Sequence, residues 1–230
     1  GEIMAELLPA GVVNIVTDQN DLGAALTAHP DVAKISFTGS TATGQKIMAS
    51  AASTIKRLTL ELGGNDAAIV LPGADPAKVA PGIFAGAFMN AGQVCLAIKR
   101  AYVHDSIYDE VCERLASLAR EAVMGDGLEQ GVTIGPLQNR MQFDKVRGYL
   151  DAARAEGRIL AGGEVADGPG YFIAPTIVAG IIPTNESRRA TKCFCEPIFA
   201  ATGTRCFSNQ YCNAFINYSP FISSTDLLYI

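Results

Sequence analysis

The stretch of sequence that decides the fold is residues 32–53, which read VAKISFTGSTATGQKIMASAAS. The apolar run that ends at Phe37 is typical of a strand, and the segment from Thr41 to Ser53 has the periodicity of a helix. Between them Gly39 permits a tight turn, and Ser40 or Thr41 can cap the helix. A strand that leads directly into a helix is the repeating unit of an α/β fold with a mainly parallel sheet.

The same alternation of strands and helices continues on both sides of this stretch. The longest predicted helix is capped by Ser106, carries an acidic Asp109 three residues on, and ends at Gly125. The other predicted elements are strands at 12–16, 58–62, 67–71 and 101–104, and helices at 21–29, 80–91 and 138–156.

The composition indicates a globular protein. Of 230 residues, 49% are apolar and 18% are charged, which is enough for one large domain or two modest ones. The net charge is −5 and no cluster of Lys and Arg occurs, so we expect no nucleic-acid partner. No apolar run reaches the roughly 18 residues of a membrane span. Six cysteines do not make a disulfide scaffold, which favours a reducing, cytoplasmic location.

The two ends of the chain differ from its middle. The chain opens at Gly1 inside an amphipathic segment and without a signal peptide, so we expect it to begin within a longer protein. Residues 186–230 contain one of 23 glycines but four of the six cysteines, with no sustained periodicity. We therefore treat 186–230 as a divergent tail. A zinc site at its cysteines is not expected, because their spacing is unusual and no histidine accompanies them.

The glycine-rich turn at 37–44 has two possible roles. Free backbone amides at a helix N-terminus suit a phosphate group, which predicts a phosphate site near Gly39 and Ser40. The pattern is not the complete dinucleotide fingerprint, however, and an ordinary strand-to-helix turn explains it as well.

Two cysteines lie before the tail. Cys95 follows Gly92-Gln93-Val94 in a connection between a helix and a strand, where a thiol is either accessible and reactive or buried as a small apolar group. Cys112 lies within the longest helix beside its apolar stripe, so we expect it to be structural.

Few other residues suggest acid–base chemistry. Glu61 is a single carboxylate in the apolar run Leu60-Glu61-Leu62-Gly63-Gly64, where it is either solvated at a sheet edge or held in a cleft as an acid or base. His29 and His104 are the only histidines, and each lies near the end of an element without a neighbouring nucleophile pattern. A Ser/His/Asp or Cys/His mechanism therefore has little support.

The segments 37–44, 60–64 and 92–95, taken together and in this order, resemble three successive signature segments of the aldehyde dehydrogenase superfamily. Shorter matches at 8–14, 134–137 and 174–177 support the resemblance, which covers roughly residues 6–180. The resemblance implies two Rossmann-like α/β domains, with residues 1–62 from the cofactor-binding domain and 63–185 from the catalytic domain.

The resemblance also implies a reaction. A cysteine thiolate attacks an aldehyde, and a general base helps water to hydrolyse the resulting thioester, with NAD or NADP as the oxidant. Carried onto this sequence, Cys95 is the nucleophile and its backbone amide is one donor to the oxyanion, while Glu61 is the general base. A coenzyme A-acylating enzyme is less favoured, because that branch typically lacks the Glu.

The cofactor residues implied by the resemblance are spread along the chain. Gly39, Ser40 and Gly44 approach the pyrophosphate, Leu62 and Gly63 line the nicotinamide side, and Glu196 is the acid that binds a ribose. Two departures weaken this pattern: Asn65 stands where a Lys is frequent, and Glu196-Pro197-Ile198-Phe199 lacks the usual Gly-Pro that follows.

The resemblance fades after Ile182, which a frameshifted reading frame or a divergent C-terminus would explain. The family's second oxyanion donor, an Asn, lies upstream of Gly1, so we expect the 230-residue chain itself to be inactive. The alternative function is a non-catalytic fragment that folds and associates. The full-length parent is expected to be a homo-oligomer with no membrane partner.

Overall fold

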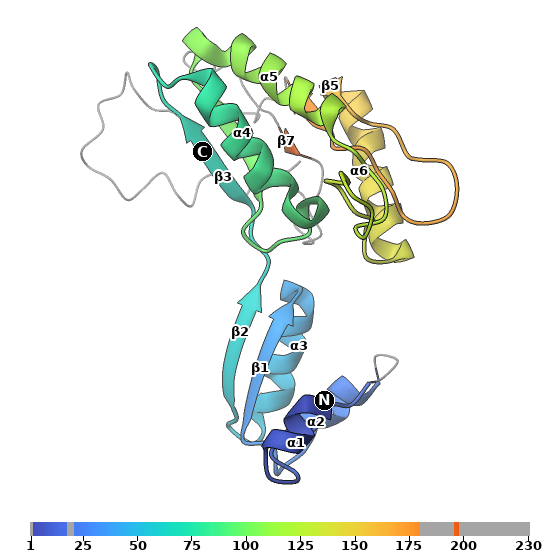
Figure 1. Ribbon diagram of the computed structural model, residues 1–230. Helices are drawn as coiled ribbons and strands as arrows, with labels where there is room; N and C mark the ends of the chain where they lie inside the picture. The colour runs from blue at the N-terminus through green and yellow to red at the C-terminus, as the bar shows by residue number, and fades with distance from the viewer. Residues whose placement is uncertain (1, 18–20, 180–195, 198–230) are drawn as a thin grey trace, which may run out of the picture. The chain divides into compact units, whose positions relative to one another are not determined.

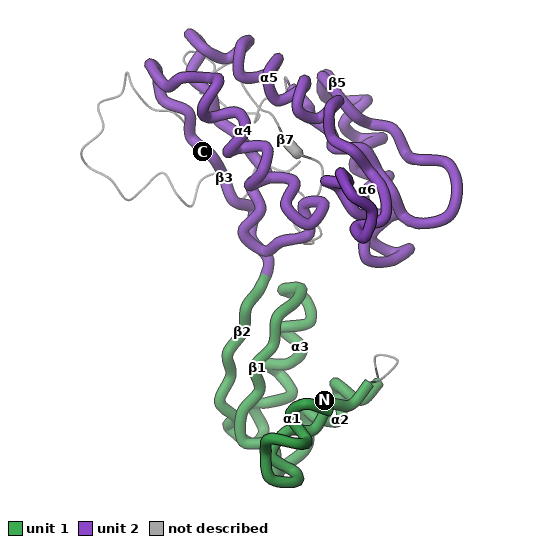
Figure 2. Tube along the Cα trace, viewed as in Figure 1, with its two compact units in different colours: residues 1–62 green, residues 63–230 purple. Residues whose placement is uncertain are grey.

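The structure is a computed structural model that describes residues 2–17, 21–179 and 196–197 (Figure 1). Its contacts divide the chain into two compact units, residues 1–62 and 63–230 (Figure 2). Apart from Glu196 and Pro197, the tail from 186, with its four cysteines, lies outside the described residues. No helix of the described ranges is long and apolar enough to cross a membrane.

The first unit is built on a parallel pair of strands joined by a helix. Strands β1 (Lys34–Gly39) and β2 (Arg57–Leu62) pair in parallel with Phe37 opposite Leu60, and α3 (Thr41–Ala52) connects them. Two short helices precede them, α1 (Glu2–Leu7) and α2 (Leu22–Ala28). This arrangement confirms the strand–helix–strand unit that residues 32–53 predict.

The helix α3 buries one face and is fixed at its start. Gly44, Ile47 and Ala51 are its buried residues, and their spacing of three and four places them on one side. Gly44 has a packing reason to be glycine, because a Cβ there would lie 2.9 Å from a methyl group of Leu62 on β2. Ser40 is the N-cap, and its hydroxyl oxygen accepts a hydrogen bond from the amide of Thr43 at 3.2 Å.

The second unit contains a parallel strand pair, an antiparallel sheet and three helices. Its parallel strands are β3 (Asp66–Val70) and β4 (Ile98–Val103), and its antiparallel strands are β5 (Arg158–Ala161), β6 (Ile177–Ala179) and β7 (Glu196–Pro197). The α-helices are α4 (Pro76–Phe88), α5 (Tyr108–Glu121) and α6 (Arg140–Glu156), with short 3-10 turns η1 (Met89–Gly92) and η2 (Asp105–Ile107). The described part of the chain is therefore α/β with parallel pairing in both units.

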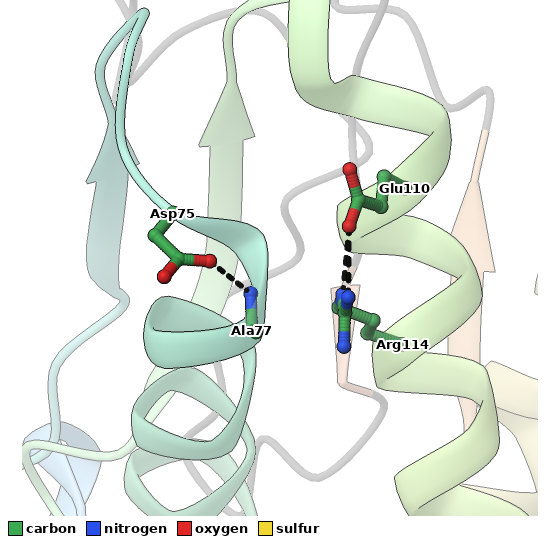
Figure 3. Close-up of polar contacts among 4 residues, drawn as sticks. All are labelled: Asp75, Ala77, Glu110 and Arg114. Carbon is green, nitrogen blue, oxygen red and sulfur yellow. Dashed lines mark hydrogen bonds and ion pairs between the residues drawn. The ribbon is translucent and has the colours of Figure 1, made fainter.

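The core of the second unit joins its helices and strands. Val103 of β4, Val111 and Leu115 of α5, Leu150 of α6 and Val178 of β6 are all buried in one apolar cluster. The start of α4 is fixed by Asp75, whose carboxylate accepts a 2.9 Å hydrogen bond from the amide of Ala77 (Figure 3). On the exposed side of α5, Glu110 and Arg114 form an i, i+4 ion pair at 2.9 Å (Figure 3).

One predicted strand is absent. Residues 12–16 are not in a strand, and Val12, Val13, Ile15 and Val16 are exposed. An isolated extended segment has no neighbour for its backbone hydrogen bonds, and no described strand pairs with this one. The alternation of apolar residues was therefore insufficient to specify a strand here.

Some predicted helix ends are also wrong. α5 ends at Glu121, four residues before the predicted stop at Gly125. Ser106 does not cap this helix, because its hydroxyl bonds to Nδ1 of His104, which accepts from the Ser106 amide and caps η2 instead. The helix predicted at 80–91 begins at Pro76 after the Asp75 cap and becomes irregular at Met89.

A sharp test of this packing lies at Gly162, which has a φ of +77°. A Cβ there would overlap the carbonyl oxygen of Pro175 and lie 2.8 Å from Cα of Thr176. We expect Gly162→Ala to lower the free energy of unfolding by about 2–4 kcal/mol, from backbone strain and overlap together.

The matched control is Gly148, which lies in α6 with no atom within 4 Å of an added Cβ. Gly148→Ala should stabilise the protein by about 0.5–1 kcal/mol through helix propensity. Thermal or denaturant unfolding measures both changes, and equal effects of the two substitutions would contradict the packing described for Gly162.

Candidate functional site

The site is centred on Cys95, in the turn between η1 and β4. Its side chain is exposed, whereas Cys112 is buried within α5. The expectation that Cys112 is structural is confirmed, and of the two readings of Cys95 the structure supports the accessible thiol. An accessible thiol at the end of a strand connection is able to meet a small electrophile.

The backbone that leads to Cys95 is held in an uncommon conformation. Three consecutive residues, Asn90, Ala91 and Gly92, have positive φ values of 52°, 53° and 73°. For the two that are not glycine, this left-handed conformation costs on the order of 1–3 kcal/mol each, so surrounding contacts must hold it in place. Strained backbone of this kind is common at functional sites.

Gln93 supplies those contacts. Its side-chain amide donates hydrogen bonds to the carbonyl oxygens of Asn90 and Pro136, each at 3.1 Å. Its side-chain oxygen accepts from the amide of Gln138 at 2.8 Å, and Asn90 donates to the Gln93 carbonyl at 3.3 Å. Gln93 therefore joins the loop before Cys95 to residues 136–138, which precede α6.

The turn that carries Cys95 is fixed through its carbonyl oxygen. This oxygen accepts a hydrogen bond from the backbone amide of Gly64 at 3.2 Å and another from Nζ of Lys99 at 3.3 Å. Gly64 must lack a side chain here, because a Cβ would lie 3.3 Å from the same oxygen and would collide with the carboxylate of Asp66. Lys99 also donates to the carbonyl of Ala97 at 2.8 Å.

Lys99 is a buried cation, with 5% of its surface exposed. Burial lowers its pKa from 10.5, while the nearby charges of Asp66 and Cys95 act in the opposite direction. Because the folded-state pKa lies below the unfolded value, protonated Lys99 costs folding free energy at neutral pH, and this cost disappears as the pH rises towards 10.5. Among the described residues no carboxylate lies within ion-pair distance of Lys99, so carbonyl oxygens are its direct partners.

Two further features bear on acyl chemistry. Within the described ranges the backbone amide of Cys95 has no hydrogen-bond partner, so it is available to an oxyanion beside the thiol. Glu61 is exposed on β2, opposite Thr38 of β1, at the end of the first unit. Its carboxylate is therefore solvated, as one of the two readings of the sequence has it.

The N-terminus of α3 has the properties of a phosphate site. The Ser40 hydroxyl accepts a hydrogen bond from the amide of Thr43. The amides of Thr41 and Ala42 have no partner in the part of the chain that the structure describes. All four residues are exposed, and α3 is 12 residues long. A Cβ at Gly39 would lie 2.5 Å from the ring of Phe37, so a side chain here would displace that ring. The residues present therefore fit a bound phosphate.

The other residues expected near a cofactor are placed as follows. Leu62, half-buried, ends β2 and packs against Gly44, and Gly63 follows it as the first residue of the second unit. Glu196 begins β7, opposite Val178 of β6, while its side chain lies outside the described residues. Gly44 and Leu62 are thus brought together by helix packing in the first unit.

Two surface hollows lie away from the thiol. One of about 480 Å³ lies between α4 and α5, and the other, of about 460 Å³, lies beside β5. Neither is lined by Cys95 or by any residue named above as a site residue. They therefore play no part in the chemistry considered for Cys95.

Sequence reasoning missed Gln93 and Lys99 as supports of the thiol. Gln93 stands out only as part of the segment 92–95, and its partners at 136 and 138 are far away along the chain. Lys99 lies in Ile98-Lys99-Arg100, which has the pattern of a strand with outward charges. The one feature of the sequence that relates Lys99 to the thiol is its position four residues after Cys95.

Known proteins resemble this chain closely. The profile of the aldehyde dehydrogenase family matches residues 1–205, which includes Glu196 and extends past Ile182, beyond which the motifs no longer show the resemblance. A probable aldehyde dehydrogenase from a Pseudomonas species is 50% identical over 179 residues, which cover 77% of this chain and 37% of that protein. The chain belongs to the aldehyde dehydrogenase family.

Solved structures agree with this assignment. An NADP-dependent enzyme of Escherichia coli superposes with a TM-score of 0.74 at 38% identity, over 85% of this chain and 40% of that one. PnpE in complex with nicotinamide adenine dinucleotide superposes with a TM-score of 0.65 at 40% identity, over 68% and 33%. The chain thus spans about two fifths or less of the length of these relatives.

The Gln93 contacts make a prediction about the loop. Gln93→Met removes the three hydrogen bonds that its side chain makes and should lower the free energy of unfolding by about 1–2 kcal/mol. It should also speed amide hydrogen exchange in the peptide that contains Gln138, whose amide loses its acceptor.

The control for this prediction is Gln142→Met, a change of the same type in the same unit. The side-chain oxygen of Gln142 is buried without a partner, so its removal should change stability by no more than about 0.5 kcal/mol. If exchange at Gln138 is unchanged in Gln93→Met, the loop is held by something other than Gln93.

Proposed function

We propose that this chain is part of an enzyme that oxidises an aldehyde to a carboxylic acid with NAD or NADP. The observation that carries the proposal is the exposed Cys95 thiol in a turn whose backbone is fixed on both sides. Family membership supports the same reaction, since one matched structure is an NADP-dependent enzyme and another is a complex with NAD.

The first step uses the Cys95 turn. The thiolate of Cys95 attacks the carbonyl carbon of the aldehyde and forms a C–S bond, while the carbonyl oxygen becomes an oxyanion. The backbone amide of Cys95, in the same residue as the thiol, is the donor that this chain offers to that oxyanion. A bound NAD(P)+ would supply the hydride acceptor for the hydrogen lost from the aldehyde carbon, so that an acyl thioester would remain on Cys95.

The second step needs a base. Glu61 takes a proton from a water molecule, whose oxygen attacks the thioester carbon, and the C–S bond breaks to release the carboxylic acid and the Cys95 thiol. Glu61 is exposed on β2, which leaves its carboxylate accessible to water.

The cofactor would be held by the first unit. The free amides of Thr41 and Ala42, with Gly39 and Ser40, would bind the pyrophosphate. Leu62 and Gly63 would line the nicotinamide side, and Glu196 would bind a ribose hydroxyl. In this proposal residues 1–62 serve the cofactor and residues 63–185 carry the thiol. The full-length protein would act as a homo-oligomer in the cytoplasm.

Thiol labelling tests the assignment of the nucleophile. In the folded chain, iodoacetamide should modify Cys95 much faster than Cys112, because only the thiolate reacts and Cys112 is buried. Peptide mapping by mass spectrometry separates these cysteines from those of the tail. Equal or faster modification of Cys112 in the folded chain would remove the basis for the proposal.

The two-step chemistry is tested in a full-length protein that contains this sequence. Glu61→Gln should slow steady-state turnover by about 100- to 10,000-fold, since the amide keeps the shape but accepts no proton. A rapid burst of NADH should remain, because the acyl enzyme still forms. Cys95→Ala is the control and should give neither burst nor turnover. Loss of the burst in a folded Glu61→Gln protein would show that Glu61 has another role.

A further inference from the structure

Lys99 is the one buried ammonium group beside the candidate nucleophile in the described part of the chain. It is 5% exposed, and its Nζ donates to the carbonyl oxygens of Cys95 at 3.3 Å and Ala97 at 2.8 Å. These two carbonyls flank the exposed residue Leu96, so a single cation spans the turn on which the thiol sits.

A buried ammonium group in this position lowers the stability of the fold unless other interactions compensate for the lost hydration. Burial of an ammonium group disfavours its charged form, and the only direct partners described for Lys99 are neutral carbonyl oxygens. A methionine or leucine would fill the same volume without that cost. After Asp66, the thiolate form of Cys95 is the next negative charge that acts on Lys99.

We propose that Lys99 is a positioning residue for Cys95, which fixes the 95–97 turn through two carbonyl oxygens and supplies the positive charge that favours the Cys95 thiolate. This inference rests on the proposed role of Cys95 as the nucleophile. The inference gives Lys99 of β4 two effects on the thiol. Its positive charge acts electrostatically, and its hydrogen bonds hold the backbone of the turn.

The other charges around Lys99 are few. Asp66 on β3 acts on it as a negative charge and raises its pKa, and Arg100, its neighbour on β4, lowers it. The guanidinium of Arg100 donates a hydrogen bond to the carbonyl oxygen of Asn65 rather than to that of Cys95. Burial lowers the pKa of Lys99, and the Asp66 carboxylate acts against that burial in favour of the ammonium form, which is the form that stabilises an anion nearby.

The test measures alkylation of Cys95 in the folded chain as a function of pH, and it requires no turnover. Lys99→Met keeps the approximate length and volume of the side chain but removes its charge. We expect the half-maximal pH of Cys95 alkylation to rise by about half to one unit, and the rate at pH 7 to fall about three- to tenfold. Labelling of buried Cys112 in the same sample reports any loss of fold.

The matched control is Lys78→Met, which removes the same charge from the same unit at a side chain that is 84% exposed. It should leave the pH profile of Cys95 unchanged. If Lys99→Met exposes Cys112 to labelling, Lys99→Gln is measured in its place, since its amide still provides a donor for the turn.

An unchanged Cys95 profile in a folded Lys99 variant would overturn the proposal. Unfolding of both Lys99 variants would also overturn it, because Lys99 would then be only structural. These outcomes differ from failure of the proposed function, which would appear as a slow Cys95 in the unsubstituted chain.

Discussion

The hydrogen bond from the Gly64 amide to the Cys95 carbonyl oxygen is the contact on which the rest of the site depends. It joins the segment that enters β3 to the turn that enters β4, which are the two strands of the parallel pair. Because Gly64 lacks a Cβ, the two backbones approach closely enough for the bond to form. The thiol is thereby attached to the parallel strand pair of the second unit, whose strand β4 packs against α4.

The site divides its tasks between backbone and side chains. In the proposed function backbone groups would do the recognition: the amide of Cys95 for an oxyanion, and the amides of Thr41 and Ala42 for a phosphate. Side chains hold that backbone in place, as Gln93 does before the thiol and Lys99 after it. Both kinds of group are needed. A backbone amide that is free to bind a ligand makes no hydrogen bond within its own loop, so side chains must hold that loop in place.

The sequence predicted what local patterns encode. The strand–turn–helix at β1 and α3 follows from apolar periodicity and the Ser40 cap, and the buried face of α5 follows from its stripe around Val111 and Leu115. The segments 37–44, 60–64 and 92–95, taken together, were sufficient to identify the family. The long-range contacts were not predictable, since no local pattern indicates that Gln93 bonds to residues 43 and 45 positions away. The false strand at 12–16 has the same origin, because a strand is specified by its neighbour as much as by its own residues.

The left-handed conformation of Asn90 and Ala91 has a consequence for the order of events during folding. Besides its local hydrogen bonds between Asn90 and Gln93, it is held through Gln93 by residues 136–138, and that support forms only after the later part of the chain has been made and has packed. Contacts between residues so far apart in sequence form late, since loop closure must come first. We therefore expect the loop before Cys95 to be unstructured in the nascent chain and to take its final form only when the unit is nearly complete. The Cys95 thiol would therefore reach its final position only late in folding. Before then, while other proteins and exposed segments of its own chain are most accessible, the structure around the thiol would not yet be formed.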